Sequence, residues 1–318
     1  MKLVILEPVY FSKEHISELK TLGEVVVCDK FSGFFKLFSS VKDVDIIITA
    51  EASIDSMMLK ECKALRLICT ASTGYDHIDI KMASELGITV TNVPGYATDA
   101  VAEYTFALLF ALLRKICKGG RYIRKNRFTR KQFRGVQLKG KTFGIIGTGA
   151  IGTRVSQIAN CFGCNVVALT LNPSAEKEKR LRLKYVEMEA LLKISDVISL
   201  HVSLNKLTEA MIGYDAFAHM QKKPILVNTS REEVINYNAL VDALSKGLIF
   251  GAGLDTLPRS FLLRKYLLSK FQNVIFSPHV AFYTPEALNK CADTVVDNIK
   301  LFISGKSQNI VNKPDYTR

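Results

Sequence analysis

The chain has 318 residues, of which 48% are hydrophobic and 23% are charged, values close to those of soluble globular proteins. This composition excludes a disordered chain, a collagen-like fibre and a disulfide-stapled miniprotein, and no run approaches the roughly 20 apolar residues of a membrane helix. The N-terminal apolar run has no signal-peptidase site, and the seven cysteines are scattered, so we expect reduced thiols and a cytoplasmic protein.

The positive charge is concentrated in one segment. Lys and Arg number 43 against 30 Asp and Glu, and residues 115–141 hold 11 of the basic residues and no acidic one. Such a segment attracts phosphates, nucleic acid or an anionic substrate. Because no motif for reading DNA or RNA accompanies it, a solvated surface arm is the favoured interpretation and a nucleic-acid partner is not expected.

The first hundred residues alternate short apolar runs with amphipathic stretches. Helices are predicted at residues 12–22 and 54–62, and strands at residues 3–6, 25–28, 45–49, 65–70 and 89–92. Val- and Ile-rich runs that alternate with helices indicate a parallel sheet built from βαβ units. Near-continuous apolar strands fit a sheet that is covered on both faces.

A second series follows a long apolar helix predicted at residues 99–118 and the basic segment. Its strands are predicted at residues 142–146, 165–170, 197–202, 225–228, 250–254 and 273–276, with helices at 151–162, 187–193, 237–246 and 284–304. Two series predict two α/β domains. The last helix is long enough to return the chain to the first domain.

A glycine-rich loop joins the first strand of the second series to a helix. Gly147, Gly149 and Gly152 form G-x-G-x-x-G, and Ala150 and Ile151 lie inside it. The first glycine allows a tight turn, the second lets backbone approach a pyrophosphate, and the third lets helix and strand pack closely. The strand-loop-helix context predicts a dinucleotide site, with the phosphates at the helix N-terminus.

The second strand of this series ends differently from an NAD fingerprint. An Asp or Glu is expected there to bind the ribose 2′-OH. Thr170 occupies the place, no acid follows until Glu176, and basic residues lie just beyond. Because an acid would repel a 2′-phosphate, its absence makes NADP as well as NAD a candidate cofactor.

Seven pieces of the chain, in order, resemble the D-isomer-specific 2-hydroxyacid dehydrogenases. They are STGYDHID (72–79), GITVTNVPGYATDAVAEYTFALLFALLR (87–114), LKGKTFGIIGTGAIG (138–152), SLHVSL (199–204), ILVNTSREEVI (225–235), AGLD (252–255) and NVIFSPHVA (273–281).

The resemblance implies a two-domain α/β fold. We expect a Rossmann domain that binds NAD(P) at residues 99–285 and a discontinuous flavodoxin-like substrate domain at residues 1–98 and 286–318. It also implies hydride exchange between the nicotinamide and C2 of a small 2-keto or D-2-hydroxy acid. A homodimer joined through the cofactor domains is expected.

The resemblance implies two catalytic residues. Arg231 resembles the arginine that holds the substrate carboxylate and keto oxygen, a task that suits a guanidinium fork. His279 resembles the acid that protonates the keto oxygen, which suits an imidazole. The backbone N–H groups of Ser72, Thr73 and Gly74 would form an anion nest for the carboxylate. Further cofactor contacts are implied for Thr170, His201, Val202, Thr229, Ser230, Arg231, Asp255, His279 and Ala281.

The chain departs from the family pattern at three places. The family has a glutamate five residues after the aspartate of AGLD, where this chain has Ser260. That carboxylate orients the histidine and favours its protonated form. Glu232 replaces a glycine and Ser203 a proline. Activity is therefore expected to be weak, and the alternative is a dinucleotide-sensing protein on the same fold.

Cys161 and Cys164 have the C-x-x-C spacing of redox and zinc sites. They close a helix, where a thiol lacks the lowered pKa that a helix N-terminus provides. No further ligands cluster nearby, so no metal site is predicted. Of the other histidines, His15 and His219 are expected on helix surfaces, and His77 is expected to be structural or next to the cofactor.

Overall fold

The computed structural model describes residues 1–7, 11–28, 43–126, 128–256 and 267–314. The chain divides into two compact units: Met1–Ala97 with Tyr283–Arg318, and Thr98–Phe282. The domain boundaries expected from the sequence, after residues 98 and 285, lie close to these. The expected α/β class with parallel sheets is confirmed.

The first unit is built on a parallel sheet in the order β2-β1-β3-β4-β5. Its strands are β1 (Lys2–Ile5), β2 (Glu24–Val27), β3 (Ile46–Thr49), β4 (Leu67–Thr70) and β5 (Thr89–Thr91). Its helices are α1 (Lys13–Leu22), α3 (Ser56–Glu61), α4 (Ile80–Glu85) and α13 (Pro285–Ile303). Alternate residues of a strand face opposite sides, so a sheet with fully buried strands needs helices on both.

Both faces of this sheet are covered. Val4, Ile47, Ile68 and Val90 pack in one cluster with residues of α3 and α4. On the other face α13 packs against β4 and α1. The two segments of the unit therefore share one core, although the whole of the second unit separates them in the sequence.

The second unit holds a seven-stranded parallel sheet in the order β12-β11-β10-β9-β6-β7-β8. Its strands are β6 (Thr142–Ile146), β7 (Asn165–Leu169), β8 (Leu183–Tyr185), β9 (Val197–Leu200), β10 (Ile225–Asn228), β11 (Gly251–Leu254) and β12 (Val274–Phe276). Its helices are α5 (Thr98–Leu113), α6 (Ile116–Arg124), α7 (Ala150–Cys161), α8 (Ala175–Leu181), α9 (Met188–Ile194), α10 (Tyr214–Ala218) and α11 (Tyr237–Lys246).

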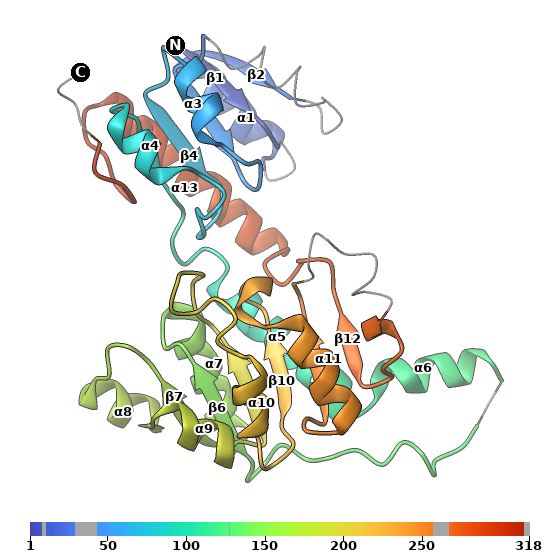
Figure 1. Cartoon of the computed structure of the whole chain (residues 1–318). Coiled ribbons are helices and arrows are strands. Elements are labelled where there is room, and N and C mark those ends of the chain that lie inside the picture. Colours follow the sequence, from blue (N-terminus) through green and yellow to red (C-terminus); the bar gives the residue numbers. More distant parts are fainter. Residues whose placement is uncertain (8–10, 29–42, 127, 257–266, 315–318) are drawn as a thin grey trace. The chain divides into compact units, whose positions relative to one another are not determined.

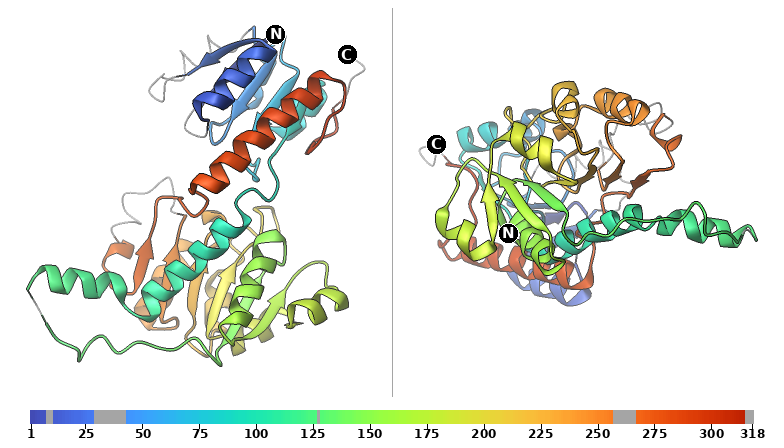
Figure 2. Two further views of the ribbon diagram at one scale, coloured as in Figure 1. Left: turned by 180° about the vertical axis from the view of Figure 1, so that it is seen from behind. Right: turned by 90° about the horizontal axis from the view of Figure 1, so that it is seen from below.

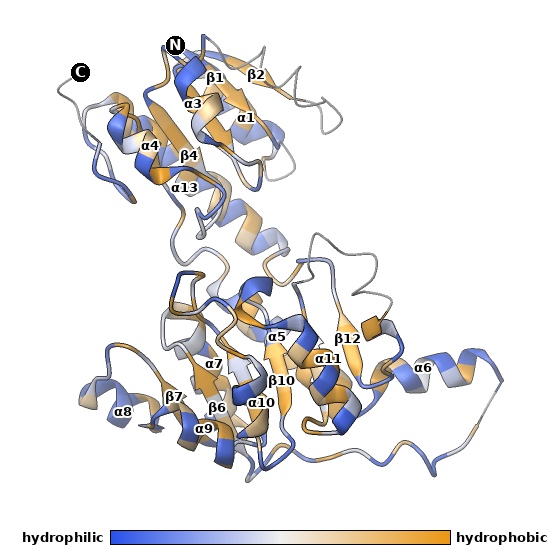
Figure 3. Ribbon diagram, in the orientation of Figure 1, coloured by the Kyte–Doolittle hydropathy of each residue, from blue (hydrophilic) through white to orange (hydrophobic). Residues whose placement is uncertain are grey.

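Neighbouring residues of β10 show how this sheet is covered. Leu226 faces the cluster that holds α9, α10 and α11, whereas Ile225 and Val227 face the cluster of α5 and α7. Hydropathy colouring shows the same division, with apolar strands between helices whose outer faces are polar (Figure 3). No helix among the described residues is long and apolar enough to cross a membrane.

The long helix predicted at residues 99–118 is wrong beyond Leu113. Lys115 has a left-handed backbone with a φ of 54°, which ends α5 and starts α6 in a new direction. No residue of α6 is buried, and this helix projects away from the rest of its unit (Figures 1 and 2). The basic segment thus begins with a helix that the hydrophobic pattern did not separate from α5.

Candidate functional site

The predicted site residues of the second unit follow the carboxyl ends of its strands. The sheet order reverses between β6 and β9, and ligands of open α/β sheets bind outside the carboxyl ends at such a switch point. The glycine loop follows β6 and Thr170 follows β7, while His201 and Val202 follow β9, Thr229–Arg231 follow β10, Asp255 follows β11 and His279 and Ala281 follow β12. The fold therefore gathers residues from six segments along one edge.

The glycine loop has the geometry that a pyrophosphate needs. Gly147 has a φ of 96°, and a Cβ there would collide with the carbonyl oxygen of His201. A Cβ at Gly152 would collide with the carbonyl oxygen of Gly147. Gly149 has open space around it and begins α7 without a side-chain cap, so the N–H groups of Ala150 and Ile151 are available to an anion. These residues fit a dinucleotide.

A lysine lies beside this loop. Lys177 of α8 places its Nζ 3.5 Å from the carbonyl oxygen of Thr148. Thr170, at the end of β7, is partly buried and uncharged. The second strand thus ends without a carboxylate, and a cation lies next to the phosphate-binding loop.

A buried asparagine shapes the turn that carries Arg231. Asn228 is fully buried; its Oδ1 accepts bonds from the backbone N–H (2.9 Å) and hydroxyl (2.7 Å) of Ser230, and its Nδ2 donates to the carbonyl oxygen of Arg231 (2.8 Å). Thr229 is hydrogen-bonded to Thr105 of α5 at 3.2 Å. The side chains of Asn228 and Thr105 therefore hold this turn in place, and Arg231 remains partly exposed after the carboxyl end of β10.

Asp255 holds the loop that carries His279. Its carboxylate is 1% exposed and accepts bonds from the Ser277 hydroxyl (2.6 Å), the Val280 N–H (3.0 Å) and the Ala281 N–H (2.7 Å). His279 lies between these anchors, exposed, with a left-handed φ of 55° and its ring 5.8 Å from that of Phe282. The aspartate therefore binds the Ser277 side chain before His279 and two backbone N–H groups after it, and so holds an otherwise strained residue in place.

His201 is a packing residue of the same edge. Burial lowers its pKa to about 3, so the imidazole is neutral in the folded protein. The ring nitrogen Nε2 of His201 is hydrogen-bonded to the Ser199 hydroxyl at 2.8 Å, and the backbone N–H of His201 donates to the carbonyl oxygen of Ile146 at 2.8 Å. The backbone of His201 lies against Gly147 and its Cβ against Gly152, so this residue packs beneath the glycine loop.

The predicted anion nest lies in the first unit, directly after β4. Within the described residues, the N–H groups of Ser72, Thr73 and Gly74 donate no hydrogen bond. The Ser72 hydroxyl, by contrast, is engaged with Thr70 (2.7 Å) and the carbonyl oxygen of Gly74 (2.6 Å). The hydroxyls shape the loop and leave its amides for a ligand.

The comparison with protein families agrees with these motifs. The model described as D-isomer specific 2-hydroxyacid dehydrogenase, NAD binding domain, matches residues 106–281, more than half of the chain. The chain belongs to the D-isomer-specific 2-hydroxyacid dehydrogenase family. The resemblance inferred from the sequence is thereby confirmed, and the matched region makes the second unit a nicotinamide-dinucleotide-binding domain.

Relatives of this dehydrogenase family cover most of the chain. Glyoxylate reductase of Thermococcus litoralis is 38% identical over 286 residues, 87% of this chain and 86% of its own. Hydroxypyruvate reductase of Blautia hydrogenotrophica is 31% identical over 98% of this chain and its whole length.

Solved structures give the same picture. An acyclic imino acid reductase in complex with NADPH and D-Arg has a TM-score of 0.90 and 31% identity over 98% of this chain and 100% of its own. D-Lactate dehydrogenase of Aquifex aeolicus, complexed with NAD and lactic acid, has a TM-score of 0.90 and 28% identity over 99% and 100%.

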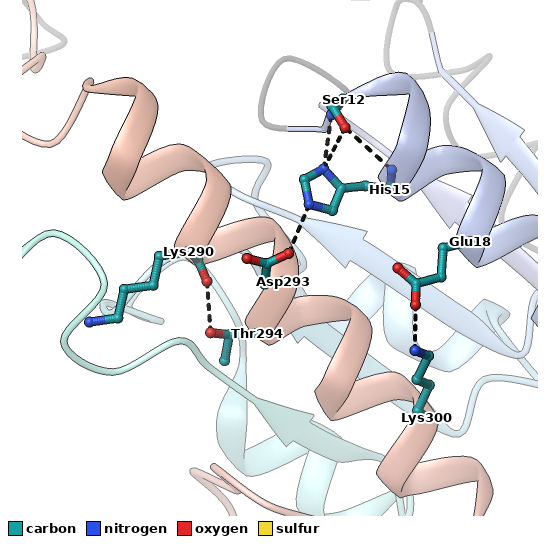
Figure 4. Close-up of polar contacts among 7 residues, drawn as sticks. All are labelled: Ser12, His15, Glu18, Lys290, Asp293, Thr294 and Lys300. Carbon is teal, nitrogen blue, oxygen red and sulfur yellow. Dashed lines mark hydrogen bonds and ion pairs between the residues drawn. The ribbon is translucent and has the colours of Figure 1, made fainter.

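Two histidines predicted on helix surfaces differ from each other. His219 ends α10 with a half-exposed side chain. His15 is only 12% exposed: its Nδ1 lies 3.2 Å from the Ser12 N–H and 2.9 Å from the Ser12 hydroxyl, and its Nε2 lies 3.1 Å from Asp293 (Figure 4). The prediction for His15 is wrong, because this ring joins the start of α1 to α13. His77 lies 3.5 Å from Thr70, beside the nest.

The cysteine pair shows no reactive geometry. Cys161 is exposed at the end of α7, whereas Cys164 is buried and burial raises its thiol pKa to about 11. All seven cysteines are free. Across the described ranges, no group of three or more His, Cys, Asp or Glu side chains is placed to hold a metal.

Sequence reasoning missed several residues that shape the site. Asn228 and Ser277 belong to two of the family motifs, but a motif does not show which distant groups these side chains contact. Lys177 is one of several basic residues that follow Glu176, and the sequence does not show that its side chain reaches the glycine loop. Ser260 lies outside the described residues, so its place in the site stays a sequence prediction.

Proposed function

We propose that the chain is an NAD(P)-dependent oxidoreductase that reduces a small 2-keto acid to a D-2-hydroxy acid. The supporting observation is the single edge of the seven-stranded sheet, which carries an open glycine loop, an anchored arginine turn and an anchored histidine loop. Relatives named glyoxylate reductase and hydroxypyruvate reductase support the same class of substrate.

The cofactor would lie across the switch point. Gly147, Gly149 and the first N–H groups of α7 would hold the pyrophosphate, and Thr170 would face the adenosine ribose. When bound, the nicotinamide supplies or accepts the hydride. Lys177 beside the loop and the missing carboxylate favour acceptance of NADPH alongside NADH.

The chain's own residues would bind and protonate the substrate. The N–H groups of Ser72, Thr73 and Gly74 would hold the carboxylate, and the Arg231 guanidinium would pair with the carboxylate and the keto oxygen. As the hydride reaches C2, His279 would donate a proton to the keto oxygen, which leaves a hydroxyl group. Asn228 holds the turn that carries Arg231, and Asp255 holds the loop that carries His279.

The assembly expected of the protein is a homodimer. The arm that begins at α6 exposes large apolar side chains, Ile116 (59%), Ile123 (56%) and Phe128 (83%), among its basic residues. Exposed apolar groups at this density mark an interaction surface. A second copy of the cofactor domain is the proposed partner, and light scattering at several concentrations would measure it.

A reductase assay tests the proposed activity. Glyoxylate, hydroxypyruvate and pyruvate are each mixed with NADH and with NADPH, and loss of nicotinamide absorbance is followed. Turnover of at least one keto acid is expected, with no requirement for added metal. If the protein binds reduced cofactor but turns over no keto acid, the dinucleotide-sensing alternative replaces the enzyme.

A further inference from the structure

The first unit holds a second anion nest, and the chain fills it with its own carboxylate. Glu7, just after β1, accepts hydrogen bonds from three consecutive backbone N–H groups after β3: Ala50 (2.8 Å), Glu51 (3.0 Å) and Ala52 (2.6 Å). The Thr49 hydroxyl lies 3.3 Å from the Glu7 carboxylate and 3.3 Å from the carbonyl oxygen of Ala52, so its one proton is shared between these two acceptors. Successive amides that converge on one carboxylate form an anion-binding concavity.

The position of this nest in the sheet is significant. The strand order β2-β1-β3-β4-β5 reverses between β1 and β3, so the carboxyl ends of these two strands form the switch point of the first unit. An anionic ligand would be expected there. Glu7 occupies the amides that would otherwise take it.

The filled nest is continuous with the open one at residues 72–74. The carbonyl oxygen of Thr49 accepts a bond from the Ala71 N–H at 2.6 Å, and the hydroxyl of the same residue lies 3.3 Å from the Glu7 carboxylate. Farther along the same two loops, the Ile54 N–H donates to the carbonyl oxygen of His77, and the Asp79 N–H donates to that of Ile54, each at 2.9 Å. The loop after β3 therefore supports the loop after β4 on both sides of the nest.

We propose that Glu7 is a positioning residue for the substrate carboxylate. Its charge closes the nest after β3 and fixes the loop that braces Ser72, Thr73 and Gly74, so that a monocarboxylate is taken only by the open nest at residues 72–74. This inference rests on the proposed function. Glu7 itself touches no substrate: it acts through the backbone of residues 49–54.

The test compares Glu7→Gln and Glu7→Ala with the control Glu24→Gln. Glu24 is an exposed acid of β2 in the same unit, so its variant removes one negative charge without opening a nest. Because the open nest binds the substrate carboxylate equally before and during reaction, misplacing it should raise KM for the keto acid about tenfold, or about 1.4 kcal/mol, with kcat unchanged. The control should match the wild type.

Acetate provides a second measurement that does not need turnover. Acetate can enter the open nest of either protein, but only in Glu7→Ala can it also refill the nest that Glu7 leaves. It should therefore raise the Tm of Glu7→Ala more than that of the wild type. If acetate raises the two Tm values equally, or if both Glu7 variants keep the wild-type KM, the proposal is overturned. Absence of keto-acid turnover in the wild type overturns the proposed function instead, and the acetate-dependent Tm still tests the nest.

Discussion

The contacts of Asp255 predict a large effect from a small change. Asp255→Asn keeps the size of the side chain but turns one acceptor oxygen into a donor. In either amide orientation, the N–H of Val280 or Ala281 then faces an NH₂ group and loses its partner. A buried donor left unsatisfied costs about 1–3 kcal/mol. Ala281 is 3% exposed, so water cannot replace its bond, whereas Val280 is only partly buried and its lost bond would cost an amount near the lower end of this range.

The loss falls on a loop that is already strained. A left-handed φ at a residue with a side chain costs about 1–2 kcal/mol, and His279 has a φ of 55°. With one anchor gone, the backbone should relax and carry the imidazole away from its place at the sheet edge. A cost of about 1–3 kcal/mol in the transition state corresponds to a loss of about 5- to 150-fold in kcat/KM.

The assay is the rate of keto-acid reduction, measured with the Kd for reduced cofactor and with Tm. Ser277→Ala is the matched control, because it removes one hydrogen bond and leaves both N–H anchors; about a fivefold loss is expected for it. Wild-type kcat/KM in Asp255→Asn would refute this account of the loop. A loss that appears entirely in the cofactor Kd would show instead that Asp255 acts through the cofactor contact that the family resemblance implies.

Other parts of the site give four further predictions. Arg231→Ala should lower kcat/KM for keto acids by an amount that corresponds to about 2–4 kcal/mol of lost transition-state stabilisation, while the cofactor Kd, read by nicotinamide fluorescence, stays unchanged. An unchanged kcat/KM would remove the arginine from the site. Lys177→Ala should weaken the binding of NADPH more than the binding of NADH in the same titration. An equal rise in both Kd values would mean that the lysine does not recognise the 2′-phosphate. Ser260→Glu should move the falling limb of the pH–rate profile to higher pH, because a carboxylate favours protonated His279; coincident limbs would show that residue 260 does not reach it. The low pKa of His201 means that unfolding takes up a proton below about pH 6.5, so stability should fall from there toward pH 3, and His201→Gln should flatten that slope in chemical denaturation.

Local patterns predicted most of the fold. The strands at residues 142–146 and 225–228 have the predicted bounds, and the other predicted strands differ by one or two residues, because most are short runs rich in Val, Ile and Leu. The strand β8 was missed since it has only three residues, LKY, and no alternation that distinguishes it from a helix end. The break at Lys115 was missed because an apolar helix and a basic helix follow each other without a proline or glycine.

The candidate site was predictable where a motif states the backbone geometry. G-x-G-x-x-G specifies a turn, room for a pyrophosphate and a packing contact; the structure has the turn at Gly147, open space at Gly149 and the close contact at Gly152. Long-range partners are different. Nothing in the local sequence of Glu7 indicates that it meets the amides that follow β3, and the three donors to Asp255 all come from the loop after β12. Such contacts depend on the order of strands in the sheet, whereas local patterns state only where each strand lies along the chain.

The place of α13 in the first unit bears on how the protein folds during synthesis. The five strands of that unit are complete by Thr91, yet the helix whose buried Cys291, Val295 and Ile299 cover one face of their sheet emerges only after the entire second unit. The second unit, by contrast, is one uninterrupted stretch that ends at Phe282. During synthesis on the ribosome, the second unit can therefore complete its core before the first. Until α13 is made, the five strands of the first unit have one apolar face uncovered. A nascent chain stalled before residue 285 should therefore bind a chaperone through its N-terminal segment, residues 1–97. The chaperone should be released once α13 has been synthesised.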